Sequence, residues 1–176
     1  MKIYLTPVTL NDSKMIVKWR NSNNVRNHCF DNRLITEESN KKFFEQYITT
    51  GKYKQFIVNK IDDEFGVVSY AIALIYLKDM DLVNARCELC IFTSDDGEWN
   101  NESQAIAIKM MLQKAFDEYK MEKVYSYVFS KNEDEIKLLE RAGLSKEAVL
   151  KKEAVDLEGN RVDVIRMSVL KGDFNE

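Results

Sequence analysis

The distribution of apolar and polar residues near the start of the chain predicts a strand followed by two short helices. Residues 3–8 have the composition of a short strand. Asn11 or Asp12 then caps a helix, because a short side-chain oxygen can accept a free backbone N–H. The polar run at residues 21–24 interrupts this helix, and a second helical segment begins near Val25.

A third helix and three strands follow. Thr36 caps the helix, acidic residues in its first turn favour the positive end of the helix dipole, and Gly51 ends it. The next three segments are typical of strands, and turns at residues 62–64 and 78–81 join them. These strand segments are residues 55–61, 66–77 and 84–93.

In the second half of the chain the spacing of apolar residues changes from that of a strand to that of a helix. Apolar residues recur at helical spacing over residues 103–119, so one stripe of this helix packs on the sheet. After a strand over residues 124–129, Asn132 and Glu135 predict a capping box at the start of another helix. The last elements are a closing Gly143 and two strands around a turn at residues 157–160. This order of elements predicts an α/β (α+β) fold with a mixed sheet, not a doubly wound one.

Composition and charge narrow the class of protein. The 176 residues are 45% apolar and 31% charged, which fits one globular domain over residues 1–176. Apolar runs are too short to cross a bilayer, and the first nine residues do not resemble a signal peptide. A net charge of −3 argues against a nucleic-acid partner, and three cysteines predict no disulfide framework. We therefore expect a cytoplasmic protein with neither a membrane nor a nucleic-acid partner.

Two features that suggest metal or acid–base chemistry have simpler explanations. Cys87 and Cys90 form a C-x-x-C string, but residues three apart on a strand point to opposite faces and cannot hold one ion. We therefore expect no metal site. His28, the single histidine, lies in a polar stretch and is expected to be exposed, with an acid–base role as the alternative.

The second half of the chain resembles a known family. Residues 128–133 and 136–144 form a strand, an Asn, a helix and a closing Gly, while residues 107–112 and 163–168 match a further helix and the last strand. On these segments the chain resembles the GCN5-related N-acetyltransferases (GNAT), especially the branch that acetylates ribosomal-protein N-termini and amino-sugar nucleotides. The resemblance implies a mostly antiparallel, twisted sheet of about seven strands flanked by about four helices.

The first helix carries a second, shorter match. Trp19, Arg20 and Asn21, followed by Val25 and Arg26, are similar to a segment of the sugar-nucleotide members, including those of pseudaminic acid synthesis. The resemblance implies that Trp19, Arg20, Asn21 and Arg26 bind the acceptor, and an Arg suits a diphosphate or a carboxylate. Trp19 also lies on an apolar stripe, so a place in the core is its alternative.

Membership of this family would imply acetyl-CoA as the co-substrate. The pantetheine arm would pair with the backbone of residues 91–93 between two splayed strands, and the pyrophosphate would face the loop at residues 100–105. Asn132 and Lys137 would also contact the cofactor. The cofactor-binding residues implied in this way are Ile91, Phe92, Thr93, Asn100, Asn101, Glu102, Ser103, Gln104, Ala105, Asn132 and Lys137.

The loop before the long helix departs from the family pattern, which has several glycines there. Residues 99–106 contain no glycine, and Glu102 brings a negative charge toward an anion site. We therefore expect weaker acetyl-CoA binding than in glycine-loop relatives. The alternative function is a non-catalytic binding protein that has kept the fold and lost the cofactor.

Glu88 is the candidate catalytic base, and Asn132 a candidate contact to the amine. Alternation along residues 84–93 puts Glu88 on a polar face, opposite the apolar face of Cys87, Leu89 and Ile91. The resemblance implies that the acceptor amine lies near this level, where a carboxylate can take a proton from the ammonium group. The alternative is a surface ion pair between Arg86 and Glu88.

The general acid is left open by the sequence. Leu139 stands where other branches of the family carry a Tyr that protonates the leaving thiolate, so Tyr125 and Tyr127 are the alternatives. Taken together, the sequence and the resemblance imply direct acetyl transfer to a primary amine of a small molecule. An amino-sugar nucleotide is the favoured acceptor and a peptide N-terminus the second. A homodimer is compatible with this prediction.

Overall fold

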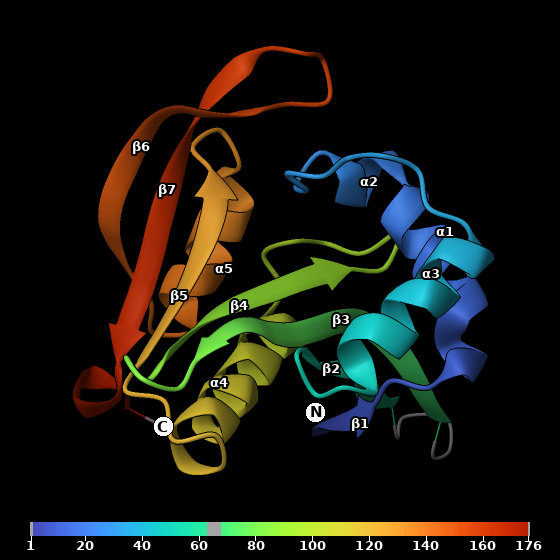
Figure 1. Cartoon of the computed structure of the whole chain (residues 1–176), viewed down its shortest axis with the longest axis horizontal. Helices are drawn as coiled ribbons and strands as arrows, with labels where there is room; N and C mark the ends of the chain where they lie inside the picture. The colour runs from blue at the N-terminus through green and yellow to red at the C-terminus, as the bar shows by residue number, and fades with distance from the viewer. Residues whose placement is uncertain (1, 63–67, 176) are drawn as a thin grey trace.

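The computed structural model describes residues 2–62 and 68–175, in which a seven-stranded sheet carries helices on both faces (Figure 1). The strands are β1 (Lys2–Pro7), β2 (Lys54–Asp62), β3 (Val68–Asp81), β4 (Arg86–Thr93), β5 (Lys123–Phe129), β6 (Ser145–Val155) and β7 (Arg161–Leu170). The α-helices are α1 (Ser13–Asn21), α2 (Asn23–Arg26), α3 (Glu37–Phe43), α4 (Glu102–Asp117) and α5 (Glu133–Arg141). The remaining helical turns are η1 (Leu10–Asp12), η2 (Phe44–Ile48) and η3 (Lys171–Asp173).

The sheet opens between its two parallel strands. Its order is β1-β2-β3-β4-β5-β7-β6, and neighbouring strands are antiparallel except for β4 and β5, which α4 connects. These two strands pair only from Arg86 with Lys123 to Glu88 with Tyr125, although β4 continues to Thr93 and β5 to Phe129. Figure 1 shows the two strands diverging, with α2 facing the opening.

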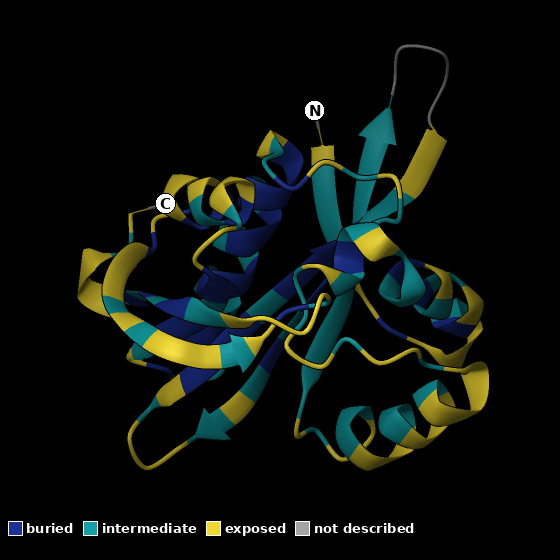
Figure 2. Ribbon diagram, turned by 90° about the horizontal axis from the view of Figure 1, so that it is seen from above, coloured by how far each residue is buried: buried dark blue, intermediate teal, exposed yellow. Residues whose placement is uncertain are grey.

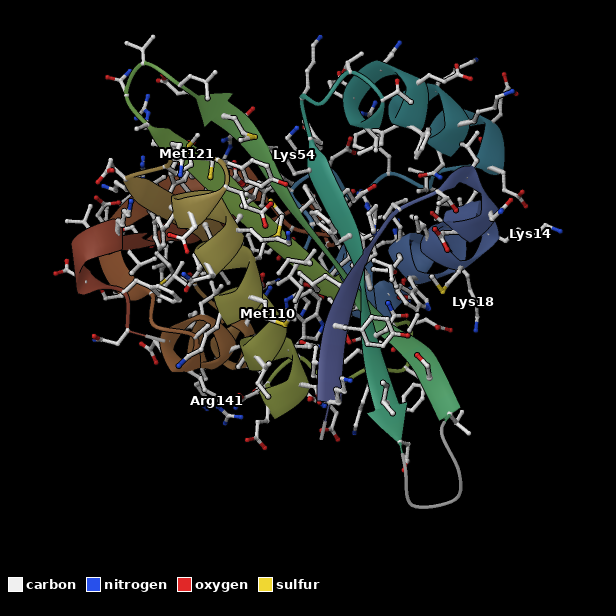
Figure 3. The ribbon with its side chains drawn as sticks, turned by 90° about the horizontal axis from the view of Figure 1, so that it is seen from below. Lys14, Lys18, Lys54, Met110, Met121 and Arg141 are labelled. Atoms are coloured by element: carbon white, nitrogen blue, oxygen red, sulfur yellow. The ribbon has the colours of Figure 1, made fainter. Side chains whose placement is uncertain are left out.

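Each face of the sheet has its own apolar core. The larger core joins Cys87, Leu89 and Ile91 of β4 to α4 and α5, and Figure 2 shows its buried residues on the central strands and on the inner side of α4. The smaller core, on the other face, contains Trp19 of α1 together with residues of α2, β3 and β4. Figure 3 shows Lys14 and Lys18 on the outer side of α1, and Arg141 on the outer side of the molecule.

The predicted fold class is confirmed. The strands and helices follow the predicted order, including the short α2 at the segment predicted near Val25, and the five α-helices compare with about four implied by the resemblance. Gly51, Gly143 and Gly159 have φ of 74°, 101° and 87°, which is the left-handed conformation that helix ends and hairpin turns require. Among the described residues no helix is both long and apolar enough to span a membrane.

The predicted turn at residues 78–81 is wrong, because β3 continues through this segment to Asp81. The strand pairing shifts between Lys78 and Asp81, and the chain turns only afterwards. The Asp81 carboxylate accepts hydrogen bonds from the backbone N–H groups of Val83 and Asn84, which fixes the turn there. The other predicted turn, at residues 62–64, and the start of the strand predicted over 66–77 lie largely outside the described residues.

The predicted caps have mixed outcomes. Thr36 caps α3, since its hydroxyl accepts a hydrogen bond from the Ser39 N–H at 3.1 Å. The cap predicted at Asn11 or Asp12 is wrong, because neither side chain caps α1. The Asp12 carboxylate instead accepts a hydrogen bond from the Thr9 N–H at 2.7 Å, which stabilises the turn η1 ahead of α1.

Candidate active site

The opening between β4 and β5 leads into a cavity of about 180 Å³. Its wall includes the charged or polar side chains of Arg20, His28, Lys78, Glu88, Tyr127 and Glu135. A wider cavity of about 550 Å³, beside the β6–β7 hairpin, shares Phe30, Lys78, Glu88 and Tyr127 with the first. The two cavities therefore adjoin at these residues, and Glu88 lines both.

Glu88 is buried in this cavity and is paired with a lysine. One carboxylate oxygen lies 3.5 Å from Lys78 Nζ, and the other accepts a hydrogen bond from Cys90 Sγ at 3.4 Å. Burial raises the pKa of Glu88 above its usual value, and Lys78 opposes this rise. Arg86 lies 3.5 Å from Asp81 instead, so the alternative ion pair between Arg86 and Glu88 is wrong.

The alternation along β4 is as predicted. Cys87, Leu89 and Ile91 pack in the larger core, whereas Cys90 lines the cavity on the opposite face. The two thiols therefore face apart, and no cluster of metal-ligating side chains occurs in the described part of the chain. Burial raises the pKa of Cys87 to about 12 and that of Cys90 well above its usual value, so both are neutral thiols at neutral pH.

The prediction that His28 is exposed is wrong. Its side chain is only 13% exposed, and its ring stacks on Trp99 with centroids 3.5 Å apart and an interplanar angle of 12°. Its Nδ1 lies 2.7 Å from a carboxylate oxygen of Glu135, which is itself buried on α5. Burial raises the pKa of Glu135, and the hydrogen bond to His28 opposes this rise. His28 therefore connects the β4–α4 loop to α5 across the opening.

The capping box predicted for α5 is also wrong. Asn132 precedes the helix, but its side chain makes no capping hydrogen bond. Its amide Nδ2 lies 3.3 Å from the carbonyl oxygen of Asn27 and 3.1 Å from His28 Nδ1. His28 thus engages the side chains of both Asn132 and Glu135, the two residues that would have formed the box.

Of the predicted acceptor residues, Arg20 lines the cavity. Its Nη2 donates a hydrogen bond to the carbonyl oxygen of Asp31, and its buried Nη1 has no hydrogen-bond partner among the described residues. Trp19 packs in the smaller core, which is the alternative prediction made for it. Asn21 exchanges two hydrogen bonds of 2.8 Å with the backbone of Ile35, and Arg26 Nε donates to the carbonyl oxygen of Asn32. Asn21 and Arg26 therefore hold loops in place.

The predicted pyrophosphate loop leads directly into α4. Asn101 caps the helix by accepting a hydrogen bond from the Ser103 N–H at 2.8 Å, and Glu102 is exposed. Gln104 is buried and donates to the Thr93 hydroxyl at 2.6 Å. The side-chain oxygens Asn100 Oδ1 and Gln104 Oε1 are buried without a partner in the described structure. Two buried acceptor oxygens therefore lie at the start of α4.

The remaining predicted residues lie along the cleft or outside it. Ile91 and Phe92 line the cavity, and Lys137 is exposed, 3.8 Å from Glu133. Leu139 is fully buried, while Tyr127 lines both cavities. Tyr125 is nearly buried, its pKa is raised by burial, and the guanidinium of Arg166 lies 4.1 Å from its ring centroid.

The opening suits a thioester-bearing arm better than it suits the pyrophosphate. Two diverging strands leave backbone groups of residues 89–93 and 126–129 without each other as partners, so an extended chain with amide groups can pair there. The start of α4 offers N–H groups without a nearby glycine turn.

Lys78 and Glu135 line the site although the sequence analysis does not predict them as site residues. Lys78 was assigned to a turn, and a longer β3 would have placed it directly opposite Glu88 in the antiparallel register. Glu135 was assigned to a cap, although its partner His28 is 107 positions away in the sequence.

Comparisons with known proteins agree with this fold. The family model described as "Acetyltransferase (GNAT) domain" matches residues 2–145. Spermidine N-acetyltransferase from Vibrio cholerae, in complex with CoA and spermine, has a similar fold: the TM-score is 0.84 at 20% identity, over 97% of this chain and 96% of that one. A dodecameric structure of the same enzyme gives a TM-score of 0.76 at 20% identity, over 97% and 94% of the two chains. No curated protein matches the sequence.

Proposed function

Because the chain belongs to the GNAT acetyltransferase family, we propose that it acetylates a primary amine of a small molecule by direct attack, with Glu88 as the base. As a family member it is an N-acyltransferase that uses acetyl-CoA, which supplies the acetyl group as an activated thioester. The observation that carries the proposal is a buried carboxylate at the point where β4 and β5 separate.

Residues on both sides of the opening would hold acetyl-CoA. The backbone of Ile91, Phe92 and Thr93 would pair with the pantetheine arm, since β4 has no strand partner on that side beyond Glu88. The loop at residues 100–105 would face the pyrophosphate, with Asn132 and Lys137 on the opposite side of the cleft. We expect this binding to be weak, because residues 100–105 carry no cationic side chain and the exposed Glu102 adds a negative charge at the start of α4.

Glu88 is suited to take the proton from the acceptor ammonium group. A base is most effective when its pKa approaches the working pH, and burial raises the pKa of Glu88 in that direction. Lys78 keeps the carboxylate charged enough to accept a proton at neutral pH. The amine, once neutral, can attack the thioester carbonyl within the cavity.

An acceptor that also carries an anionic group fits the cavity best, and an amino-sugar nucleotide is the favoured class. Three carboxylates in the wall are already paired: Glu88 with Lys78, Glu135 with His28, and Asp31 with Arg33. Among the charged residues that line this cavity, Arg20 is the one with a buried side-chain nitrogen that has no hydrogen-bond partner in the described chain. A phosphate or carboxylate of the acceptor would satisfy it. A polyamine, which offers only cations, would leave this nitrogen of Arg20 without a partner.

We further propose that residues 1–176 act as one domain in the cytoplasm and that two copies form a homodimer. A dodecameric neighbour makes self-association reasonable, and the two cavities are built from residues of one chain. Size-exclusion chromatography with light scattering would measure the oligomeric state. A monomer at all concentrations would refute the homodimer and leave the enzymatic proposal unchanged.

A thiol-release assay tests the function. Purified protein is incubated with acetyl-CoA and, in separate reactions, amino-sugar nucleotides, peptides with a free N-terminus, aminoglycosides and polyamines. We expect the highest kcat/KM with an anion-bearing amine, and we expect Arg20→Gln to raise the KM for that acceptor with little change in kcat. Arg141→Gln, a charge loss on the outer side of the molecule, is the matched control. Bound acetyl-CoA without turnover of any amine would favour the non-catalytic alternative.

A further inference from the structure

His28 borders two cavities. The inner cavity, of about 180 Å³, has Glu88 in its wall. The outer cavity, of about 360 Å³, lies at the start of α5 and is lined by residues 131–134 together with His28 and Trp99. His28 and Trp99 are the described residues that line both. The indole of Trp99 can only donate a hydrogen bond, so His28 is the one of the two that can take up and release a proton.

Glu135 fixes the orientation of the imidazole. Its carboxylate oxygen lies 2.7 Å from His28 Nδ1, and the stack on Trp99 holds the ring plane. A carboxylate accepts hydrogen bonds and does not donate them, so the shorter contact puts the hydrogen on Nδ1 and the lone pair on Nε2. The amide nitrogen of Asn132, 3.1 Å from the same Nδ1, then lies beside the ring without donating a hydrogen bond to it. The same arrangement of a buried carboxylate behind an imidazole prepares the far nitrogen for proton transfer in other enzymes.

The far nitrogen is accessible. No described residue forms a hydrogen bond with Nε2, yet Nε2 does not belong to the buried side-chain atoms that lack a partner. Nε2 is therefore not fully buried, and the ring that carries it lines both cavities.

We propose that His28, oriented by Glu135, carries the proton released in acetyl transfer from the inner cavity to the outer one. The inference rests on the proposed function. An ammonium group and an acetyl thioester give an amide, a free thiol and one proton, which has to leave Glu88 before the next turnover. Glu88 takes this proton from the ammonium group, and Nε2 receives it through water while Nδ1–H stays on Glu135. The imidazolium then releases the proton into the outer cavity, which regenerates the neutral ring.

The other charged and titratable groups around His28 and Glu135 are less suited than His28 to carry the proton. On the outer side they are Lys131, Glu133 and Asp134, and on the inner side Arg20, Cys29, Asp31, Tyr76, Lys78, Glu88, Cys90 and Tyr127. Burial raises the pKa of Tyr76 and of Cys90 well above their usual values. Burial raises the pKa of Cys29 to about 11, and the ion pair with Arg33 lowers that of Asp31 to about 2. Neither therefore exchanges protons readily at neutral pH. A purely structural role, in which the dyad ties the segment after α2 to α5, predicts different results below.

The protonation of His28 can be read without any activity, because the chain has a single histidine. Long-range ¹H–¹⁵N spectra of the full-length protein would give the tautomer of this ring. We expect the Nδ1–H tautomer in the wild type at high pH, and loss of that preference in Glu135→Gln, whose amide can present either an N–H or an oxygen to Nδ1. An Nε2–H tautomer in the wild type would overturn the proposal, whatever the activity of the enzyme.

Kinetics separate a relay from a structural bridge. We expect His28→Gln to lower kcat about tenfold or more in dilute buffer, to leave KM for acetyl-CoA within about twofold, and to be rescued by added imidazole. For the Glu135→Gln variant of the tautomer experiment, the control is Glu140→Gln, which removes a charge on the exposed side of α5. A wild-type rate in His28→Gln, or a loss that imidazole does not restore, would overturn the relay alone. Absence of transfer by the wild type would instead overturn the proposed function.

Discussion

Glu88 and Glu135 face the same cavity from opposite sides, and they are buried to nearly the same extent, with 7% and 6% of their surface exposed. Burial raises the pKa of both carboxyl groups. Their partners differ: Glu88 lies beside the amine of Lys78, whereas Glu135 is bonded to the imidazole of His28. A lysine stays cationic at neutral pH, and a histidine can lose its proton. The two carboxylates are equally buried but differ in their partners: Glu88 has a fixed counter-charge, and Glu135 has a partner that can exchange protons.

Replacement of Glu88 should have the largest effect on the rate, and it tests the proposed base directly. Glu88→Gln removes the proposed base and should lower kcat about 100-fold, since general base catalysis contributes at least that factor. It should also remove the acidic limb of the pH–rate profile, because the active form of Glu88 is the carboxylate that exists above its pKa. Acetyl-CoA affinity, measured by calorimetry, should not change. An unaltered rate across pH would leave Glu88 as a structural partner of Lys78.

Removing the counter-charge of Glu88 should have the next largest effect. Lys78 lowers the pKa of Glu88, so Lys78→Met should raise it further and move the acidic limb of the pH–rate profile to higher pH. At neutral pH the rate should fall several-fold, as less of Glu88 is ionised. Lys146→Met, an exposed lysine on β6, is the control. A limb that stays at the same pH would show that Lys78 does not control Glu88.

The ring of His28, the partner of Glu135, stacks on Trp99, and the loop that carries Trp99 can be tested through Gly97. A Cβ at this position would lie 1.9 Å from Thr93 Oγ1, and the Gly97 carbonyl accepts a hydrogen bond from Asn24. Gly97→Ala should therefore shift the loop that carries Trp99 and lower the free energy of unfolding by about 1–3 kcal/mol. Gly172→Ala, where a Cβ would meet nothing within 4 Å, is the matched control in chemical denaturation. Equal stability of both variants would contradict the close approach at Gly97.

The smallest expected effect concerns the start of α4. Glu102 is exposed, so its charge acts on a bound phosphate through solvent and is screened by salt. Glu102→Lys and Glu102→Gly should tighten acetyl-CoA binding a few-fold at low salt, with the gain of the Lys variant largely lost at high salt. Glu140→Lys makes the same charge change on α5 and serves as the control. Titration calorimetry that finds no change in either variant would show that Glu102 does not oppose the cofactor.

The sequence predicted those features that depend on local pattern. Alternation along β4 placed Glu88 on the cavity side and Cys87 in the core, because strand periodicity fixes which face a side chain occupies. The helix α4 followed from its apolar stripe, and the opening between β4 and β5 followed from the family resemblance.

The sequence failed where a distant residue competes with a local signal. Asn132 and Glu135 have the spacing of a capping box, but His28 engages both side chains from 104 and 107 positions away. The polar surroundings of His28 in the sequence suggested exposure, whereas the fold stacks it on Trp99. Lys78 was missed because Asp79 takes a positive φ of 49° inside a strand, which composition does not reveal.

Mass spectrometry of the acceptor tests the central claim most directly. The protein is incubated with acetyl-CoA whose acetyl group is isotopically labelled and with the best amine of the panel. The account predicts that the labelled acetyl group appears on the amine nitrogen, with one free CoA thiol for each amide formed, and that Glu88→Gln slows both together. Labelled acetyl-CoA that binds to the protein and is recovered intact, with every amine unchanged, would contradict it.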